Sequence, residues 1–199
     1  NAGTPRGQLF PCYAIPIDDS VSGIFEAAKN QAIVQQSGGG TGFNFSNIRP
    51  QGDSVRDRVG VASGPVKFMA VFDKVGDSVL QNGRRMGANM GILRIDHPDI
   101  LPFISQKQDG KTMNNFNISV GLTEKFMDAV EKNSEFSLIH PVRKEPVQSV
   151  NARSIFDLLI LNAWRTGDPG ILFFDRLTHS RSNPLMGYAE IESTSPCGE

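Results

Sequence analysis

The sequence predicts an α/β fold built around a parallel β-sheet. Stretches rich in apolar and β-branched residues alternate with longer amphipathic stretches, as strands and helices alternate in such folds. Residues 171–175 form a short apolar run that ends on an acid, which is typical of a strand at the centre of a parallel sheet. The length of 199 residues fits one domain, or part of one.

The first half of the chain carries signals for two strands and two helices. A buried strand is expected over residues 9–17, and a helix over 18–36, whose first three residues offer side chains for its N-cap. The glycine-rich residues 37–42 predict a loop before a short strand at 43–48. A helix over 65–80 begins with a proline and has one apolar face.

The second half continues the alternation of strand and helix. Thr123 is the expected cap of one of its helices. A polar segment that contains proline predicts a surface loop at 176–187. The expected strands are 90–95, 117–122 and 171–175, and the expected helices lie after residue 98, at 123–132 and at 154–165.

Charge and composition limit the classes of partner. The 20 basic and 21 acidic side chains nearly cancel, which argues against a nucleic-acid binder or a membrane-surface protein. No apolar run approaches the roughly 20 residues that cross a bilayer, and the N-terminus has no signal-peptide core. We therefore expect a cytoplasmic protein whose partners are small molecules or other proteins.

The two ends of the chain and its two cysteines indicate a fragment with chemistry near its end. The sequence begins at Asn1 rather than at methionine and stops at Glu199, so we expect a fragment. Cys12 and Cys197 form neither a disulfide framework nor a metal-binding array. In a reducing compartment they are either buried small residues or reactive groups.

Most histidines and aromatic residues are interpreted as structural. His97, His140 and His179 lack the spacing of metal ligands, so no metal site is expected. Trp164 and the thirteen phenylalanines are expected in the core.

Two glycine-flanked loops are candidates for nucleotide binding. Four glycines within residues 38–42 form either an anion-binding backbone nest or a plain tight turn. Residues 81–89 combine two arginines with glycines and amides, which suits a loop that contacts phosphate or base edges or, alternatively, a solvated turn. Arg49, Arg56 and Arg58 lie in another glycine-flanked connection. This connection and the loop 81–89 are the two cationic loops, and together they suggest a triphosphate site.

The tail, residues 193–199, places a thiol two residues from a carboxylate in a tight loop. Loops on a rigid scaffold often carry reactive groups. The carboxylate of Glu199 would hinder formation of a Cys197 thiolate, which argues against an ordinary cysteine nucleophile. A neutral thiol that loses a hydrogen atom meets no such objection, and an inert buried cysteine is the alternative.

These segments, taken in order, resemble the large catalytic chain of ribonucleotide reductases, and most closely the adenosylcobalamin-dependent class II enzymes. The resemblance spans nearly the whole chain, and the order of many short matches makes it specific. The matching segments are NAGT at residues 1–4, QL at 8–9 with Cys12, SGGGTGF at 37–43, GVASGPV at 60–66, GANMG at 87–91, DHPDI at 96–100, NFNISV at 115–120, TGDPG at 166–170 and PCGE at 196–199.

The resemblance implies a ten-stranded α/β barrel with a finger loop that carries the radical cysteine. Residues 1–199 would be a single partial domain, the first half of that barrel, truncated at the finger loop and inactive alone. Cys197 would become a thiyl radical and remove the 3′ hydrogen of a ribonucleotide, while Glu199 accepts the proton of the 3′-hydroxyl. Cys12 would protonate the departing 2′-hydroxyl and form half of a disulfide, which a thiol reductant such as thioredoxin reduces.

The resemblance also implies a set of substrate contacts. The sequence departs from the family at three positions, two of them among these contacts and one in the effector loop. Ser195 stands where the family has asparagine, and serine lacks the amide's paired donor and acceptor. Pro11 replaces a small residue, and Leu80 replaces a lysine of the effector loop. The implied substrate-binding residues are Pro11, Cys12, Gly40, Ser195, Pro196, Cys197, Gly198 and Glu199, and the implied catalytic residues are Cys12, Ser195, Cys197 and Glu199.

Regulation by a deoxynucleoside triphosphate is a further implication of the resemblance. Gln81 and Arg85 match the loop that relays effector identity to the substrate base. The helices after Asp19 and Pro65 would form a homodimer contact, so their exposed faces should carry apolar residues. The implied effector-binding residues are Asp19, Ser20, Arg49, Arg56, Gln81 and Arg85.

Two alternatives remain open from the sequence. One is a class I reductase large subunit, which takes its radical from a separate metal-containing subunit. The other is a regulatory nucleotide-binding fragment without activity, which would use only the two cationic loops.

Overall fold

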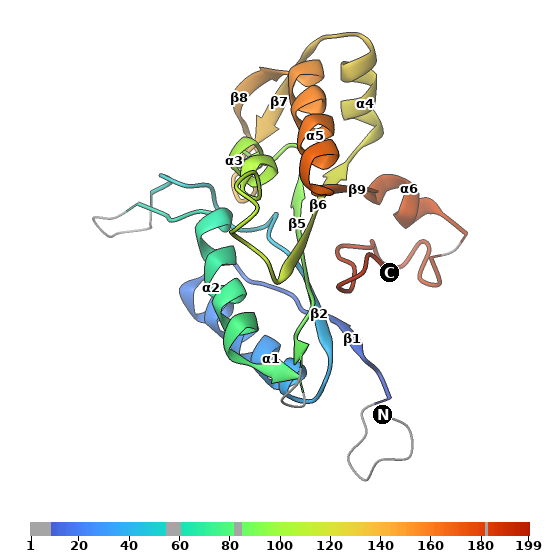
Figure 1. Cartoon of the computed structure of the whole chain (residues 1–199). Helices are drawn as coiled ribbons and strands as arrows, with labels where there is room; N and C mark the ends of the chain where they lie inside the picture. Colours follow the sequence, from blue (N-terminus) through green and yellow to red (C-terminus); the bar gives the residue numbers. More distant parts are fainter. Residues whose placement is uncertain (1–8, 55–60, 82–84, 182) are drawn as a thin grey trace.

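A five-stranded parallel sheet organises the computed structural model, which describes residues 9–54, 61–81, 85–181 and 183–199 (Figure 1). Every neighbouring pair of its strands is parallel, and the strands follow one another across the sheet in chain order. The α/β prediction is therefore confirmed. The strands are β1 (Cys12–Ala14), β2 (Gly40–Asn44), β5 (Asn89–Arg94), β6 (Phe116–Leu122) and β9 (Gly170–Phe173), in the order β1-β2-β5-β6-β9.

Helices connect the strands, and three of them begin at caps that the sequence supplies. Ser20 accepts a hydrogen bond from the backbone N–H of Gly23 at 3.0 Å, and Thr123 does the same for Phe126 at 3.2 Å. Asn151 caps the longest helix of the second half. The helices are α1 (Val21–Gln36), α2 (Pro65–Ser78), α3 (Ile100–Ser105), α4 (Glu124–Glu131), α5 (Ala152–Thr166) and α6 (Phe174–His179).

The core is one cluster of buried side chains that joins the sheet to helices α1 to α5 and to β7, and aromatic rings fill the part under α2. The ring of Phe72, from α2, meets Phe43 of β2 at 4.8 Å and Phe45 at 5.3 Å between centroids, in edge-to-face arrangements. These three side chains are fully buried. Figure 1 shows α1 and α2 on one side of the strands and the C-terminal segment on the other, so the two faces have different neighbours.

Two antiparallel hairpins were not predicted. The larger joins β7 (Glu135–Ile139) to β8 (Pro146–Asn151), and the smaller joins β3 (Leu80–Gln81) to β4 (Arg85–Met86). The strand β7 alternates exposed and buried residues, but β8 is exposed along most of its length. Because β8 buries little, its sequence lacks the alternation by which a strand is recognised.

Several predicted boundaries are wrong, for identifiable reasons. The strand expected over residues 9–17 shrinks to β1, because prolines flank it and Leu9 and Phe10 are exposed. The predicted loop 37–42 contains the first half of β2, so its last glycines are strand residues. The predicted strand 171–175 becomes β9, which ends at Phe173 and lies at the edge of the described sheet rather than at its centre.

The expected loop 176–187 and the expected aromatic core also need correction. The loop begins inside α6, a short helix with an acid in its first turn and basic residues in its last, which suits the helix dipole. Trp164 is 81% exposed, and Phe10 and Phe25 are also exposed, so these rings are not core residues. His97 and His140 are buried and hydrogen-bonded, as the structural interpretation predicted.

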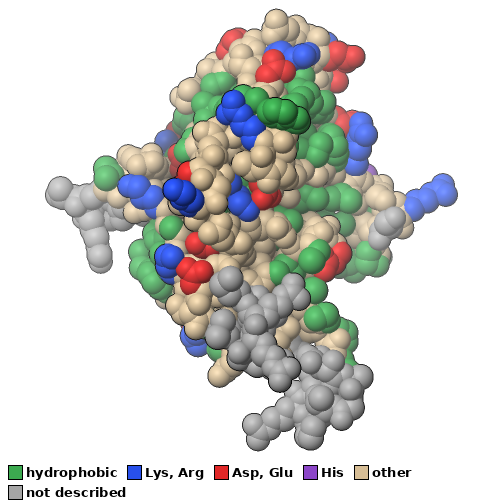
Figure 2. Space-filling model, viewed as in Figure 1, with side chains coloured by type: hydrophobic (Ala, Val, Ile, Leu, Met, Phe, Trp, Pro, Cys, Tyr) green, Lys and Arg blue, Asp and Glu red, His purple; other side chains and the backbone are tan. Residues whose placement is uncertain are grey.

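The surface carries mixed charge. On the face shown in Figure 2, lysine and arginine side chains are interspersed with aspartate and glutamate. Within the described residues, no helix combines the length and the apolar character that crossing a membrane requires.

Candidate functional site

The C-terminal loop, residues 193–199, lies against the face of the sheet opposite α1 and α2 (Figure 1). The amide of Asn117, on β6, donates to the carbonyl oxygen of Pro196 at 2.9 Å. Asn44, at the end of β2, donates to the carbonyl of Glu192, just before the loop. The loop is therefore held by side chains from two different strands.

Hydrogen bonds within the loop close it into a tight turn. The backbone N–H and the hydroxyl of Ser195 both donate to the carbonyl oxygen of Glu199, at 2.8 and 2.9 Å. The N–H of Gly198 returns to the Ser195 carbonyl at 3.1 Å, and Gly198 has a φ of 89°, which glycine adopts without strain. Ser195 is buried and closes the turn, while the thiol-bearing Cys197 is exposed.

The carboxylate of Glu199 is bound by groups from both ends of the chain. The Cys197 N–H donates to its Oε2 at 3.0 Å. The thiol of Cys12, on β1, lies within hydrogen-bonding reach of the same side chain. We call Cys12, Cys197 and Glu199 the catalytic cluster, because they are three of the four residues predicted to be catalytic; the catalytic role of the fourth, Ser195, stays a prediction.

Proton affinities in the catalytic cluster follow from these contacts. Burial raises the pKa of Cys12, and the hydrogen bond and negative charge of Glu199 raise it further. The pKa of Glu199 is lowered, first by its own backbone and then by the Cys12 thiol. Cys12 is therefore kept as a neutral thiol, and Glu199 as a carboxylate.

Gly40 and Gly42 make room for the loop rather than forming an anion nest. Gly40 pairs in register with Cys12, and a Cβ added to it would lie 2.5 Å from Pro196 Cγ. A Cβ added to Gly42 would lie 1.8 Å from the Thr194 carbonyl oxygen. The role of Gly40 in substrate approach stays a prediction. So does that of Pro11, which is exposed and whose carbonyl accepts from the Gly40 N–H.

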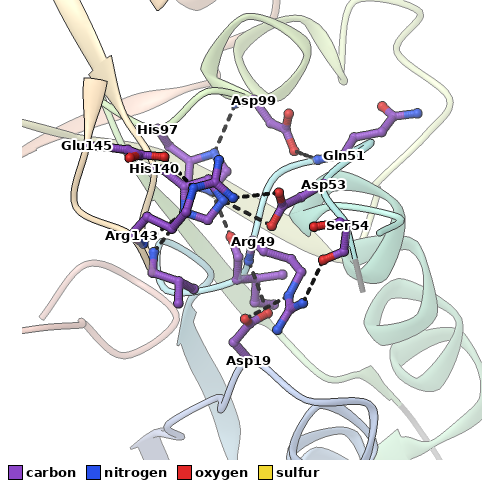
Figure 3. A network of polar contacts seen from close by, with 12 residues as sticks. Asp19, Arg49, Gln51, Asp53, Ser54, His97, Asp99, His140, Arg143 and Glu145 are labelled. Carbon is purple, nitrogen blue, oxygen red and sulfur yellow. Dashed lines mark hydrogen bonds and ion pairs between the residues drawn. The ribbon is translucent and has the colours of Figure 1, made fainter. Parts of the chain in front are cut away.

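A second cluster lies at the start of α1 and is shown in part in Figure 3. We call Asp19, Ser20 and Arg49 the effector cluster. The Asp19 carboxylate accepts from Arg49 Nε at 2.9 Å and from its backbone N–H at 3.1 Å, and Arg49 Nη1 also donates to the Ser54 carbonyl. These residues border a pocket of about 360 Å³, which is completed by Val21, Ile24, Ile48, Val61, Ala62, Ser63, Gly64 and Phe68.

The other predicted effector residues are only partly placed. Arg56 and Arg58 lie outside the described residues. Gln81 of β3 and Arg85 of β4 are opposite each other in the antiparallel pairing of these two strands. Their contacts with a nucleotide stay a prediction.

A buried polar node joins α1 to β2 and β5, and sequence reasoning missed it. The side-chain oxygen of Asn89, at the start of β5, accepts from Gln31 and Gln35 of α1 and from Thr41 of β2, at 3.1, 2.8 and 2.6 Å. Asn89 lies three residues after β4. The polar residues of α1 were a signal, because a helix face that should be apolar carries two glutamines.

A second missed feature connects the β7–β8 hairpin to the segment after the effector cluster (Figure 3). His140 Nε2 lies 3.1 Å from the Asp53 carboxylate, and Arg143 Nη1 donates to the same group at 2.8 Å. Burial opposes ionisation of Asp53, but the hydrogen bonds from Arg143 and His140 outweigh it and lower its pKa. The nearby His97 bridges the Ile48 carbonyl and the Asp99 N–H.

The exposed face of α1 carries apolar side chains, as predicted, whereas α2 contributes half-buried valines. Val21, Phe25 and Ile33 of α1 are 67%, 51% and 55% exposed. An apolar groove of about 580 Å³ between the two helices is lined by Ala32, Ala70, Val71, Val75 and Val79, with Lys74 and Ser78. Apolar surface beyond what the core needs is typical of a contact with another protein surface.

The fold and the site define an α/β protein with two thiols and a carboxylate gathered on one face of a parallel sheet. The sequence profile of the family described as "Ribonucleotide reductase, barrel domain" matches residues 11–199. The chain belongs to the ribonucleotide reductase family.

Curated relatives agree over the whole chain. It is 48% identical over 200 residues to the vitamin B12-dependent ribonucleoside-diphosphate reductase of Thermoplasma acidophilum, covering 100% of this chain and 26% of that protein. It is 42% identical over 200 residues to the enzyme of the same description from Mycobacterium tuberculosis, covering 100% and 29%. The ribonucleoside-diphosphate reductase large subunit of Arabidopsis thaliana is 29% identical over 227 residues, covering 100% and 28%. The chain thus spans about a quarter of the length of these relatives.

Proposed function

We propose that the protein containing this chain reduces ribonucleotides to 2′-deoxyribonucleotides by radical chemistry at the catalytic cluster. One observation carries the proposal: Cys12, near the start of the sequence, is folded against Glu199, which lies two residues after Cys197. Cys197 is exposed, as a group that reacts with a substrate must be. The sheet face that carries them would line the site.

The reaction needs each group in the protonation state that its surroundings favour. A Cys197 thiyl radical takes the 3′ hydrogen atom, so that an S–H bond forms and a C–H bond breaks. The Glu199 carboxylate takes the 3′-hydroxyl proton, and the neutral Cys12 thiol gives its proton to the departing 2′-hydroxyl, which leaves as water. Substrate hydroxyls would replace the Cys12 hydrogen bond to Glu199.

Reduction by two electrons requires a second thiol besides Cys12. Cys12 and Cys197 are the only cysteines of this sequence, and Cys197 returns its hydrogen atom to the 3′ carbon at the end of the reduction, which restores the thiyl radical and supplies no net electrons. The partner of Cys12 in a disulfide must therefore come from another part of the longer protein. A dithiol reductant such as thioredoxin would restore both thiols.

Adenosylcobalamin is the proposed cofactor, because the relatives that are 48% and 42% identical to this chain are named vitamin B12-dependent. Its chemistry would supply the unpaired electron that Cys197 carries. The exposed thiol of Cys197 fits that need, and we assign no other described residue to the cofactor.

We further propose the family's barrel and its regulation. The five-stranded sheet would be one half of a ten-stranded α/β barrel, with residues 193–199 as its finger loop and residues 1–199 as a partial domain. A deoxynucleoside triphosphate would bind at the effector cluster with Arg56, and Gln81 and Arg85 would relay its identity. The apolar faces of α1 and α2 would form a homodimer contact.

A class I reductase is the second candidate, supported by the similarity to the Arabidopsis large subunit. Supplying the full-length protein with adenosylcobalamin, a dithiol and a ribonucleotide, and no second subunit, distinguishes the two. We expect deoxyribonucleotide product from the wild type and none from Cys197→Ser. Product that appears only with a metal-containing subunit would favour class I, and equal turnover by Cys197→Ser would overturn the radical proposal.

A further inference from the structure

Four positions on one face of the sheet contact the C-terminal segment: Gly40, Gly42, Asn44 and Asn117. Gly42, Met90 and Asn117 are in register across β2, β5 and β6, and side chains in register in a parallel sheet point to the same face. Gly40 and Asn44 lie two residues before and after Gly42, so they share that face. Glycine stands where the loop touches the strand, and asparagine stands where the loop presents a carbonyl.

The contact of Asn117 differs from that of Asn44 because of the peptide group it binds. Asn44 binds the Glu192 carbonyl, which is several residues from the reactive groups. Asn117 binds the carbonyl of Pro196, and the N–H of the same peptide group belongs to Cys197. That N–H donates to Glu199 Oε2 at 3.0 Å.

One peptide plane therefore joins the sheet to the carboxylate. Asn117 Nδ2 donates to the Pro196 oxygen at 2.9 Å, and the opposite end of the plane donates to Glu199. Because a peptide group is planar, fixing its C=O also fixes the direction of its N–H. Hydrogen bonds in such a chain strengthen one another, since each polarises the next.

We propose that Asn117 is a positioning residue: it orients the Pro196–Cys197 peptide and thereby holds the Glu199 carboxylate, and the Cys197 side chain that follows, in their reactive places. The effect of Asn117 on catalysis rests on the proposed function. Its effect on the orientation of Glu199 does not depend on that function. The side-chain hydrogen bond of Asn117 is to the loop backbone and not to a reactive side chain.

Exposed Asn114 provides a matched control. Its amide donates to the Lys111 carbonyl, also at 2.9 Å, and it lies three residues before Asn117, in a turn away from the loop. Asn117→Asp keeps the size of the side chain and removes its N–H donors. Asn114→Ala removes an exposed amide hydrogen bond of the same length, with no link to the catalytic cluster.

The first test measures turnover by the full-length enzyme. Asn117→Asp and Asn117→Ala should lower kcat roughly 10- to 100-fold, with the KM for ribonucleotide within about threefold, while Asn114→Ala stays near wild type. In a Glu199→Gln background, Asn117→Asp should lose most of its effect, because the carboxylate it orients is gone. An equal factor in both backgrounds, or an unchanged kcat, would overturn the proposal.

The second test needs no turnover. Iodoacetamide labelling of Cys12 in the full-length protein, without substrate or cofactor, is followed against pH by peptide mass spectrometry. Glu199 raises the pKa of Cys12, so loosening Glu199 with Asn117→Ala should move the labelling midpoint to lower pH, unlike Asn114→Ala. A shift in a protein that reduces no ribonucleotide would reject the proposed function alone, and identical midpoints would reject the role of Asn117.

Discussion

The catalytic cluster and the effector cluster are assembled in different ways. The catalytic cluster joins the two ends of the chain, and it depends on strand register and on glycines that admit a backbone segment. The effector cluster forms where a helix begins, and an ion pair between Asp19 and Arg49 closes it. The comparison indicates that the first site depends on backbone placement, whereas the second depends on charge.

The largest expected effect falls on the catalytic cluster. Glu199→Gln removes the proposed base and should lower kcat of the full-length enzyme by about 10²- to 10⁴-fold. It also removes the charge that raises the pKa of Cys12, so Cys12 should be alkylated at lower pH than in the wild type. A variant with full turnover would show that the carboxylate takes no part in the reaction.

A smaller effect is expected at the effector cluster, where charge dominates. An anionic effector competes with Asp19 for the Arg49 guanidinium, so Arg49→Ala should weaken deoxynucleoside triphosphate binding roughly 10-fold, as measured by calorimetry. Arg153→Ala, which breaks an exposed ion pair on α5, is the control and should bind normally. Unchanged binding by Arg49→Ala would remove this pocket from consideration as the effector site.

The smallest effect concerns the tether between Asp53 and the β7–β8 hairpin. The lowered pKa of Asp53 means that its contribution is present above the ordinary value of about 3.9 and is lost as pH falls through the folded value. Asp53→Asn should speed hydrogen exchange of residues 135–151 about fivefold at pH 7, an effect of order 1 kcal/mol. The ratio of variant to wild-type rates should fall toward one as the pH is lowered through the folded pKa of Asp53. A ratio that does not change with pH would show that the Asp53 charge is irrelevant.

The sequence predicted the strand–helix alternation and the reactive residues better than their contacts. Apolar periodicity located α1, α2, α4 and α5 within a few residues, because their buried faces repeat with the helical period. The prediction failed at β2, because its glycines were interpreted as a turn. In the structure they are strand residues that leave space for the C-terminal loop. The prediction also failed at Trp164, since hydrophobicity alone does not tell a core residue from an exposed one.

In the candidate site, too, the sequence predicted the reactive residues but not the residues that hold them in place. Cys12, Cys197 and Glu199 were identified by chemistry and family resemblance, and the structure brings them together. Asn117 and Asn89 were missed, because an isolated asparagine carries no local signal of a partner distant in the sequence. Their roles depend on the register of β5 and β6, which only the folded sheet fixes.

The central claim is that Cys197 carries the radical in a site shared with Glu199 and Cys12. Electron paramagnetic resonance of the full-length enzyme, quenched after mixing with adenosylcobalamin and a ribonucleotide, tests it most directly when the protein contains β-deuterated cysteine. The account predicts a sulfur-centred signal that narrows with deuteration, persists in Asn114→Ala and is absent in Cys197→Ser. The same signal in Cys197→Ser would contradict it.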